Sequence, residues 1–173
     1  DGADFEINMY GNGPLMEQYQ QKIQAEALSG CVHIMGNRNN DEILAAMQQN
    51  NIFLFTSDRN EGWGAVANEA MSNGCTLVGS DQIGAVPFLI KNNVNGRIFK
   101  SRDIDSLYNA VNGLLTDREN CEQLALEAYA SMRNVWSPEN AAKSLLILIN
   151  DLQNGSNTSI TEGPCSKAEP FNN

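Results

Sequence analysis

The sequence predicts an α/β fold built around a parallel β-sheet, and two observations support this. Short apolar runs bounded by polar residues, such as Ile52 to Phe55 and Thr76 to Gly79, are typical of buried strands. Between these two runs lies a stretch with helical character, and strand–helix–strand units build parallel sheets. Ligand sites of such sheets lie beyond the carboxyl ends of the strands, so the loops after the strands are the candidate sites.

Composition narrows the possible functions. The chain has 173 residues, enough for one domain with a substantial core, and a net charge of −10. This acidity argues against nucleic acid and against a strongly anionic membrane surface as partners. No apolar run approaches the ~20 residues of a membrane span, and no basic, apolar leader begins the chain. We expect a cytoplasmic protein.

The cysteines and the histidine predict no metal site. The four cysteines are too widely spaced for a zinc or redox motif, so we expect packed, reduced thiols. The cysteines are Cys31, Cys75, Cys121 and Cys165. His33 has no carboxylate or cysteine directly beside it in sequence, so we interpret it as a packed or surface residue.

The first elements are a strand, a helix and a second strand. Apolar residues alternate over 5–9, and a helical repeat follows from Leu15 to about Leu28. Between them, Gly11 and Gly13 could hold a phosphate or could simply form a tight strand-to-helix turn. The next strand covers 31–35, and Arg38 lies in the loop after it. This arginine could contact a ligand or could be solvated.

A short helix follows, for which Asp41 is a candidate cap, and then the central unit. After the strand that ends at Phe55, a loop leads to a predicted helix over 64–72, which Asn73-Gly74 ends. Glu61 precedes this helix and Glu69 lies within it. Both carboxylates could face a ligand, although solvated glutamates are the simpler interpretation of the residues alone.

The remaining elements complete one domain. We expect a glycine-containing loop over 80–87, a strand over 97–100 and three helices, the last beginning at Ser137-Pro138. The apolar stripes of these helices predict core packing. Residues 1–153 would therefore form the domain. Residues 154–173 would be a polar, flexible tail or a segment that docks on another domain.

The run E-G-W-G-A-V-A-N-E-A-M-S-N-G, which begins at Glu61, resembles the signature of a known family. Glycosyltransferase family 4, the retaining nucleotide-sugar enzymes also called glycosyl transferases group 1, has Glu, Gly–aromatic–Gly, a second Glu eight positions after the first, Ala-Met and a Gly. The resemblance extends from about Phe5 to Leu152. It implies the GT-B fold, in which two Rossmann-like domains face each other across a cleft, and this chain would be the carboxyl-terminal domain, with helices on both faces of its parallel sheet.

The resemblance also implies roles for the candidate residues. The whole enzyme would transfer a sugar from a UDP- or GDP-linked donor to a hydroxyl in polysaccharide or glycan biosynthesis, without a metal or other cofactor. Glu61 would be the catalytic residue and would bind sugar hydroxyls, and Glu69 would bind the ribose. The remaining donor-binding positions would be Gly11, Gly13, Arg38, Gly62, Trp63 and Gly64.

Two departures from the family pattern stand out. The family begins this domain with a strand ending in Gly-Arg, followed by a Lys, and the chain starts after that point. We therefore expect a fragment of a hexosyl-type transferase that lacks its first strand and is inactive by itself. The acceptor, and any membrane contact, would belong to an amino-terminal domain that the fragment lacks. The loop after Gly84 has Phe88 where the family commonly has Glu.

Two other functions fit the sequence less well. A non-catalytic nucleotide-sugar binding module would keep the same site without transfer, and a Rossmann-like scaffold would bind no ligand. A receiver domain is one such scaffold, and it needs an acidic pair after its first strand, which is absent here.

Overall fold

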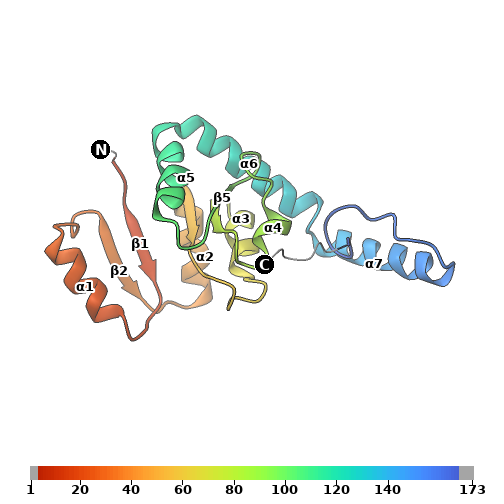
Figure 1. Cartoon of the computed structure of the whole chain (residues 1–173), viewed down its shortest axis with the longest axis horizontal. Coiled ribbons are helices and arrows are strands. Elements are labelled where there is room, and N and C mark those ends of the chain that lie inside the picture. The colour runs from red at the N-terminus through yellow and green to blue at the C-terminus, as the bar shows by residue number, and fades with distance from the viewer. Residues whose placement is uncertain (1–3, 168–173) are drawn as a thin grey trace.

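A computed structural model of the chain describes residues 4–167, and it is an α/β structure (Figure 1). The strands are β1 (Ile7–Tyr10), β2 (Val32–Gly36), β3 (Ile52–Phe55), β4 (Thr76–Ser80) and β5 (Arg97–Phe99). The helices are α1 (Met16–Ala25), α2 (Asn40–Gln49), α3 (Val66–Ser72), α4 (Val86–Leu89), α5 (Ile104–Thr116), α6 (Arg118–Asn134) and α7 (Pro138–Gln153). The predicted fold class is confirmed, and each predicted strand is present within one or two residues of its expected bounds.

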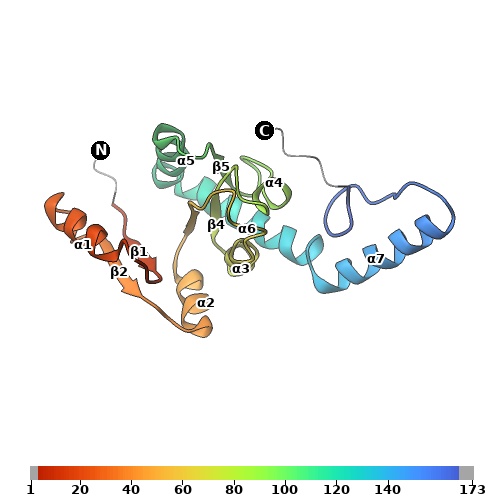
Figure 2. The ribbon, with the colours of Figure 1, turned by 60° about the horizontal axis from the view of Figure 1, so that its bottom comes forward.

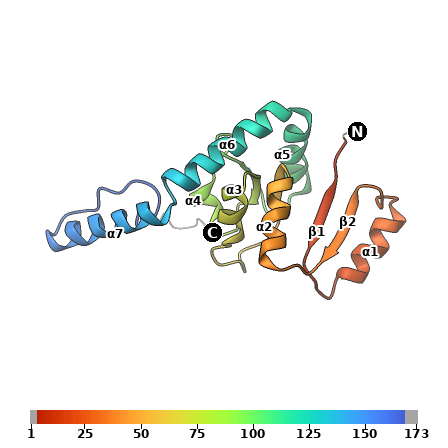
Figure 3. The ribbon, with the colours of Figure 1, turned by 180° about the vertical axis from the view of Figure 1, so that it is seen from behind.

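The parallel sheet is divided into two parts. β1 pairs only with β2, and β3, β4 and β5 form a separate three-stranded sheet in that order. All pairs are parallel, as the strand–helix–strand pattern predicts. Figures 1 and 3 show β1 between β2 and the larger part of the molecule. Within the described chain, β1 and β3 are therefore edge strands of two neighbouring sheets.

Successive side chains of β3 and β4 point to opposite faces of the larger sheet, so each face has its own part of the core. Phe55 and Leu77 pack on one face with α3, α4 and the second half of α6. Val78 packs on the other face with Leu114 of α5 and the first half of α6. Every residue of β4 is buried, whereas most of β3 is only half-buried. The difference arises because β4 has a partner on both sides and β3 has one only.

Side-chain caps begin four of the described helices, α2, α5, α6 and α7, and one predicted cap was wrong. Asn39, rather than Asp41, precedes α2: its side chain accepts a hydrogen bond from the Glu42 amide, and Glu42 accepts one from the Asn39 amide. Asp103 caps α5, and the predicted start of the last helix at Ser137-Pro138 is confirmed, with Ser137 as the cap of α7. Asn39 is the cap because it lies just before the helix and its side chain accepts from an amide of the first turn, whereas Asp41 lies inside that turn.

The glycine-containing loop over 80–87 holds a short helix that the sequence did not predict. α4 is four residues long and has Pro87 in its first turn. Val86 and Leu89 are buried against the larger sheet. A helix this short has no sequence periodicity, so only its burial against the sheet reveals it.

The apolar stripe of the last helix was predicted to pack in the core, and most of it does not. α7 projects away from the rest of the domain (Figure 2). Its large apolar side chains are exposed, Leu146 and Leu152 by about two thirds of their surface (68% and 67%). The spacing correctly predicted an amphipathic helix, but within the described chain only part of its apolar stripe is covered: Leu148 is half-buried, whereas Leu145, Ile149 and Leu152 are exposed.

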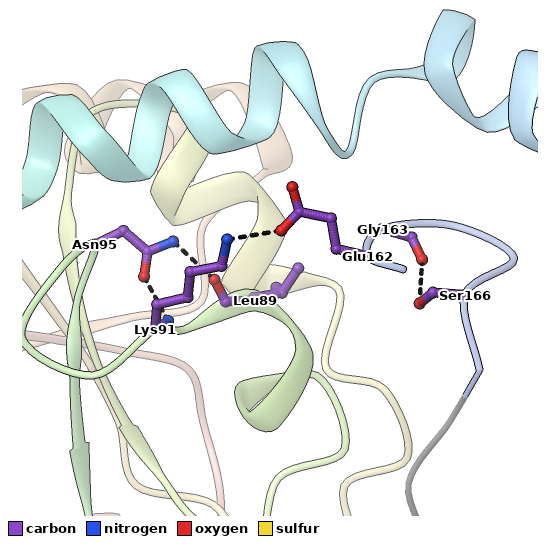
Figure 4. Close-up of polar contacts among 6 residues, drawn as sticks. All are labelled: Leu89, Lys91, Asn95, Glu162, Gly163 and Ser166. Atoms are coloured by element: carbon purple, nitrogen blue, oxygen red, sulfur yellow. Dashed lines mark hydrogen bonds and ion pairs between the residues drawn. The ribbon is translucent and has the colours of Figure 1, made fainter. Parts of the chain in front are cut away.

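The segment after α7 makes contacts that the prediction of a flexible tail did not include. Lys91 Nζ lies 2.6 Å from a carboxylate oxygen of Glu162 (Figure 4). The buried Gly163 lies against Val135, and Thr161, Glu162, Gly163 and Ser166 line a cavity of about 490 Å³ together with α4 and the end of α6. Residues 154–167 therefore fold back onto the domain, and residues 168–173 of the predicted tail lie outside the described residues.

The cysteines are all unpaired, as predicted. Burial raises the pKa of the Cys75 thiol from 9.0 to about 11, and the nearby Cys121 adds to the shift. Burial also raises the pKa of Cys121. His33 has a partner that sequence distance concealed: its Nε2 lies 3.5 Å from Glu6. Among residues 4–167, no helix combines the length and apolar character needed to cross a bilayer.

Candidate functional site

The loop that follows β3 holds most of the predicted site residues, and its path depends on Gly64. The backbone of Gly64 has φ +83°, and a Cβ at this position would lie 2.7 Å from the Phe55 ring. Glycine alone combines this left-handed conformation with so close an approach. The loop then enters α3 at Val66, two residues later than predicted. Gly62, Trp63 and Gly64 consequently lie on extended or turning backbone before the helix.

The loop after β4 lies directly against this segment. The Ala85 amide donates a hydrogen bond to the Trp63 carbonyl oxygen, at 2.8 Å. A Cβ on Gly84 would lie only 1.9 Å from the Gly62 carbonyl oxygen. Gly84 was not among the predicted site residues, although its glycine-containing loop at a strand end was. The structure thus joins the carboxyl ends of β3 and β4 into one site.

Glu61 lies on the loop after β3 and Glu69 on α3, the helix that follows it, and each is half-buried. Neither carboxylate forms an ion pair or accepts a hydrogen bond from a protein group within residues 4–167. The same holds for the amides of Gly62, Trp63 and Gly64, which donate to no protein acceptor in that range. The site therefore offers both carboxylate acceptors and amide donors to a ligand.

The remaining predicted residues, Gly11, Gly13 and Arg38, lie on the smaller sheet. Gly11 has φ +120°, and its amide donates to the Gly36 carbonyl oxygen at 3.0 Å, which ties the ends of β1 and β2 together. Gly13 contributes its carbonyl oxygen to the turn before α1. Arg38 donates to the Asn37 carbonyl oxygen and lies 3.9 Å from Glu42. No hydrogen bond or ion pair among the described residues joins this group to the loop after β3.

An aromatic cluster at the site was not recognised from the sequence. The ring of Trp63 lies 5.7 Å from that of Phe88 and 5.7 Å from that of Trp136. Its indole N–H donates to the Asn68 side-chain oxygen at 2.8 Å. These residues are far apart in sequence and follow no shared spacing. The one available signal was Phe88, an aromatic residue at the position where the resemblance has an acid.

These groups together suit a polar, hydroxylated and anionic ligand. Carboxylates accept hydrogen bonds from paired hydroxyl groups, and free backbone amides donate to phosphate oxygens. Within residues 4–167, no group of three His, Cys, Asp or Glu side chains is placed to hold a metal ion. The carboxylates and amides of the loop can supply hydrogen bonds and charge stabilisation to a ligand.

Comparison with known proteins agrees with this chemistry. Residues 2–131 match the model of the family described as "Glycosyl transferases group 1". Poly(glycerol-phosphate) alpha-glucosyltransferase of Bacillus subtilis is 24% identical over 84% of the chain, which spans 21% of that protein. The amylovoran biosynthesis glycosyltransferase AmsK of Erwinia amylovora is 27% identical over 87% of the chain, which spans 38% of that protein. The chain thus corresponds to well under half the length of these relatives.

Solved structures show the same fold. The structure of HepE from Anabaena in complex with UDP superposes with a TM-score of 0.65 at 26% identity, covering 75% of this chain and 36% of that one. The α/β architecture matches the carboxyl-terminal Rossmann-like domains of GT-B glycosyltransferases. Because the family model covers most of the chain, the protein belongs to the glycosyl transferases group 1 family.

Proposed function

We propose that this chain is the donor-binding part of a retaining glycosyltransferase of family 4. The whole enzyme would transfer a hexosyl group from a UDP- or GDP-linked sugar to a hydroxyl acceptor in polysaccharide or glycan synthesis. The observation that carries this proposal is the joined pair of loops after β3 and β4. Free amides at Gly62, Trp63 and Gly64 lie there beside the unpaired carboxylate of Glu61.

Each group has a distinct task in this proposal. The free amides stabilise the diphosphate as it leaves, because they are donors already held in place. Glu61, the catalytic residue, accepts hydrogen bonds from the sugar hydroxyls and orients the ring. Glu69 accepts hydrogen bonds from the ribose. HepE supports the assignment of the ligand, since its structure contains UDP.

The divided sheet supports a further part of the proposal. When the two sheets are placed end to end, the strand order is β2–β1 and then β3–β4–β5. This is the order of a doubly wound sheet that lacks one central strand between β1 and β3. We assign this place to a first strand of the whole enzyme, which would carry the Gly-Arg and Lys of the family. That strand would also bring Gly11, Gly13 and Arg38 into one sheet with the loop after β3. The chain alone would then bind donor but not transfer it.

Titration of the chain with UDP and GDP, followed by NMR, tests donor binding. We expect saturation transfer to the ribose and to one base. Glu69→Ala should weaken binding roughly tenfold or more, because a hydrogen-bonded charge is lost. Glu122→Ala, which removes an exposed carboxylate from α6, is the matched control and should leave affinity unchanged. Absence of binding to both nucleotides would contradict the donor-binding role, and equal affinity of Glu69→Ala and the control would contradict the role of Glu69.

A further inference from the structure

At Gly62, Trp63 and Gly64, the loop after β3 makes one hydrogen bond to the loop after β4, and the side chain of Trp63 is its other polar and aromatic anchor. Gly62 and Gly64 flank this residue, and glycine backbones lose more conformational freedom on ordering than any other residue. Between them, the Trp63 carbonyl oxygen accepts one hydrogen bond, from the Ala85 amide. The orientation of the free amides at Gly62, Trp63 and Gly64 therefore depends on what anchors the indole.

Three separate elements anchor that indole. Asn68 of α3 accepts the indole N–H, and its own side-chain nitrogen lies 3.7 Å from the sulfur of Met132 on α6. The Phe88 ring of α4 and the Trp136 ring, which precedes the cap of α7, each lie 5.7 Å from the Trp63 ring in tilted arrangements. Tilted and offset aromatic pairs at such distances are favourable beyond the area they bury.

Phe88 and Trp136 have no direct place in the donor site described above. Both are half-buried, and both line the cavity under the carboxyl-terminal segment. Trp63, by contrast, keeps 41% of its surface exposed. The two rings thus support Trp63 from inside the domain while its free surface and the neighbouring amides stay accessible.

We propose that Phe88 and Trp136 are positioning residues, which act through Trp63 to orient the amides and the carboxylate of the loop after β3. The inference rests on the proposed function only for the identity of the ligand. In this chain the aromatic ring of Phe88 packs on Trp63 and so supports the loop, at a position where the family commonly has Glu. Loss of either ring frees the indole and widens the range of orientations that the amides adopt.

Two measurements test this proposal on the full chain, one of them without ligand. The first is hydrogen exchange of the Ala85 amide, whose acceptor is the Trp63 carbonyl oxygen. The second is titration with UDP. Trp136→Leu and Phe88→Leu should each speed Ala85 exchange several-fold and weaken UDP binding roughly two- to tenfold. Trp136→Phe, which keeps a ring, should restore most of both properties.

Two controls separate positioning from a general loss of stability. Leu114→Ala opens the core on the other face of the sheet, among Val78, Phe99, Cys121 and Leu124, and should lower stability without changing Ala85 exchange relative to other buried amides. In the combination of Trp63→Leu with Trp136→Leu, UDP affinity should be no lower than in Trp63→Leu alone, because Trp136 acts through Trp63.

The outcomes are distinct. If Ala85 exchange in Trp136→Leu and Phe88→Leu is no faster than in Leu114→Ala, the proposal is wrong. It is also wrong if the loss of UDP affinity in the double variant equals the sum of the losses in the two single variants. If the wild-type chain binds no UDP, the proposed function fails, and Ala85 exchange alone decides the positioning role. If Trp136→Leu does not fold, Phe88→Leu provides the same comparison from α4.

Discussion

At the scale of single residues, Gly84 is the position in the site with the least space. Gly84→Ala would place a Cβ 1.9 Å from the Gly62 carbonyl oxygen, so one of the two loops must move. We expect UDP affinity to fall roughly tenfold, which corresponds to about 1.4 kcal/mol. Gly113→Ala in α5 is the control, because no atom lies within 4 Å of the added carbon. Calorimetric titration measures both, and unchanged affinity of Gly84→Ala would show that the two loops adjust independently of the ligand.

The buried thiol of Cys75 predicts a dependence of stability on pH. Burial raises its pKa from the ordinary 9.0 to about 11 in the folded chain. As pH rises from about 9 to about 11, the unfolded chain releases this proton while the folded chain keeps it, so the free energy of unfolding falls. Below pH 9 both states hold the proton, and the contribution is constant. Urea unfolding at pH 8 to 10.5 should show a smaller decline in Cys75→Ala than in the wild type, and parallel curves would contradict the assignment.

At the scale of secondary structure, the capping box of α2 links a local sequence pattern to the core. Asn39→Ala removes the acceptor of the Glu42 amide, 2.9 Å away, and should lower the free energy of unfolding by about 1 kcal/mol. The loss reaches the core because Met47 of α2 packs on Ala70 and Cys75. Asn40→Ala, one residue further and exposed, is the control and should change stability little. Equal urea midpoints for the two variants would mean that the cap adds nothing.

At the scale of the whole molecule, the chain exposes many large apolar side chains on α7. The exposed apolar side chains of α7 include Leu145, Leu146, Ile147, Ile149 and Leu152. Exposed apolar side chains gathered on one helix promote association. Sedimentation velocity should show self-association that rises with concentration and that Leu146→Glu reduces. Asn109→Glu, at an exposed position of α5, adds the same charge away from α7 and should not reduce it. A monomer over the whole concentration range would contradict this expectation.

Local patterns in the sequence were sufficient for most of the elements. The apolar run of β3 and the cap of α7 at Ser137 were predicted where the structure has them, because strand burial and helix capping depend on neighbouring residues. α4 and the capping of α2 by Asn39 were not predicted. The first depends on burial against a distant strand, and the second on which of two adjacent polar side chains reaches the free amides.

In the site, too, some residues could be predicted from the sequence and others could not. The paired glutamates, the glycines beside Trp63 and their place after a strand could be predicted, since they are contiguous and follow from strand order. Phe88, Trp136 and Gly84 could not be assigned to the loop, because they approach it from 20 or more residues away in sequence. His33 of β2 likewise has a carboxylate neighbour, Glu6, only because β1 and β2 lie side by side.

The sequence by itself determined the α/β class, the order of strands and helices and the family, because each is encoded in short-range periodicity or in a contiguous motif. Only the tertiary structure decided that the sheet is divided between β1 and β3, that the apolar face of α7 is exposed and that residues 154–167 return to the domain. The physical reason is that an apolar stripe specifies a surface to be covered but not what covers it. Contact between segments remote in sequence arises from the packing of the whole chain, which no local pattern contains.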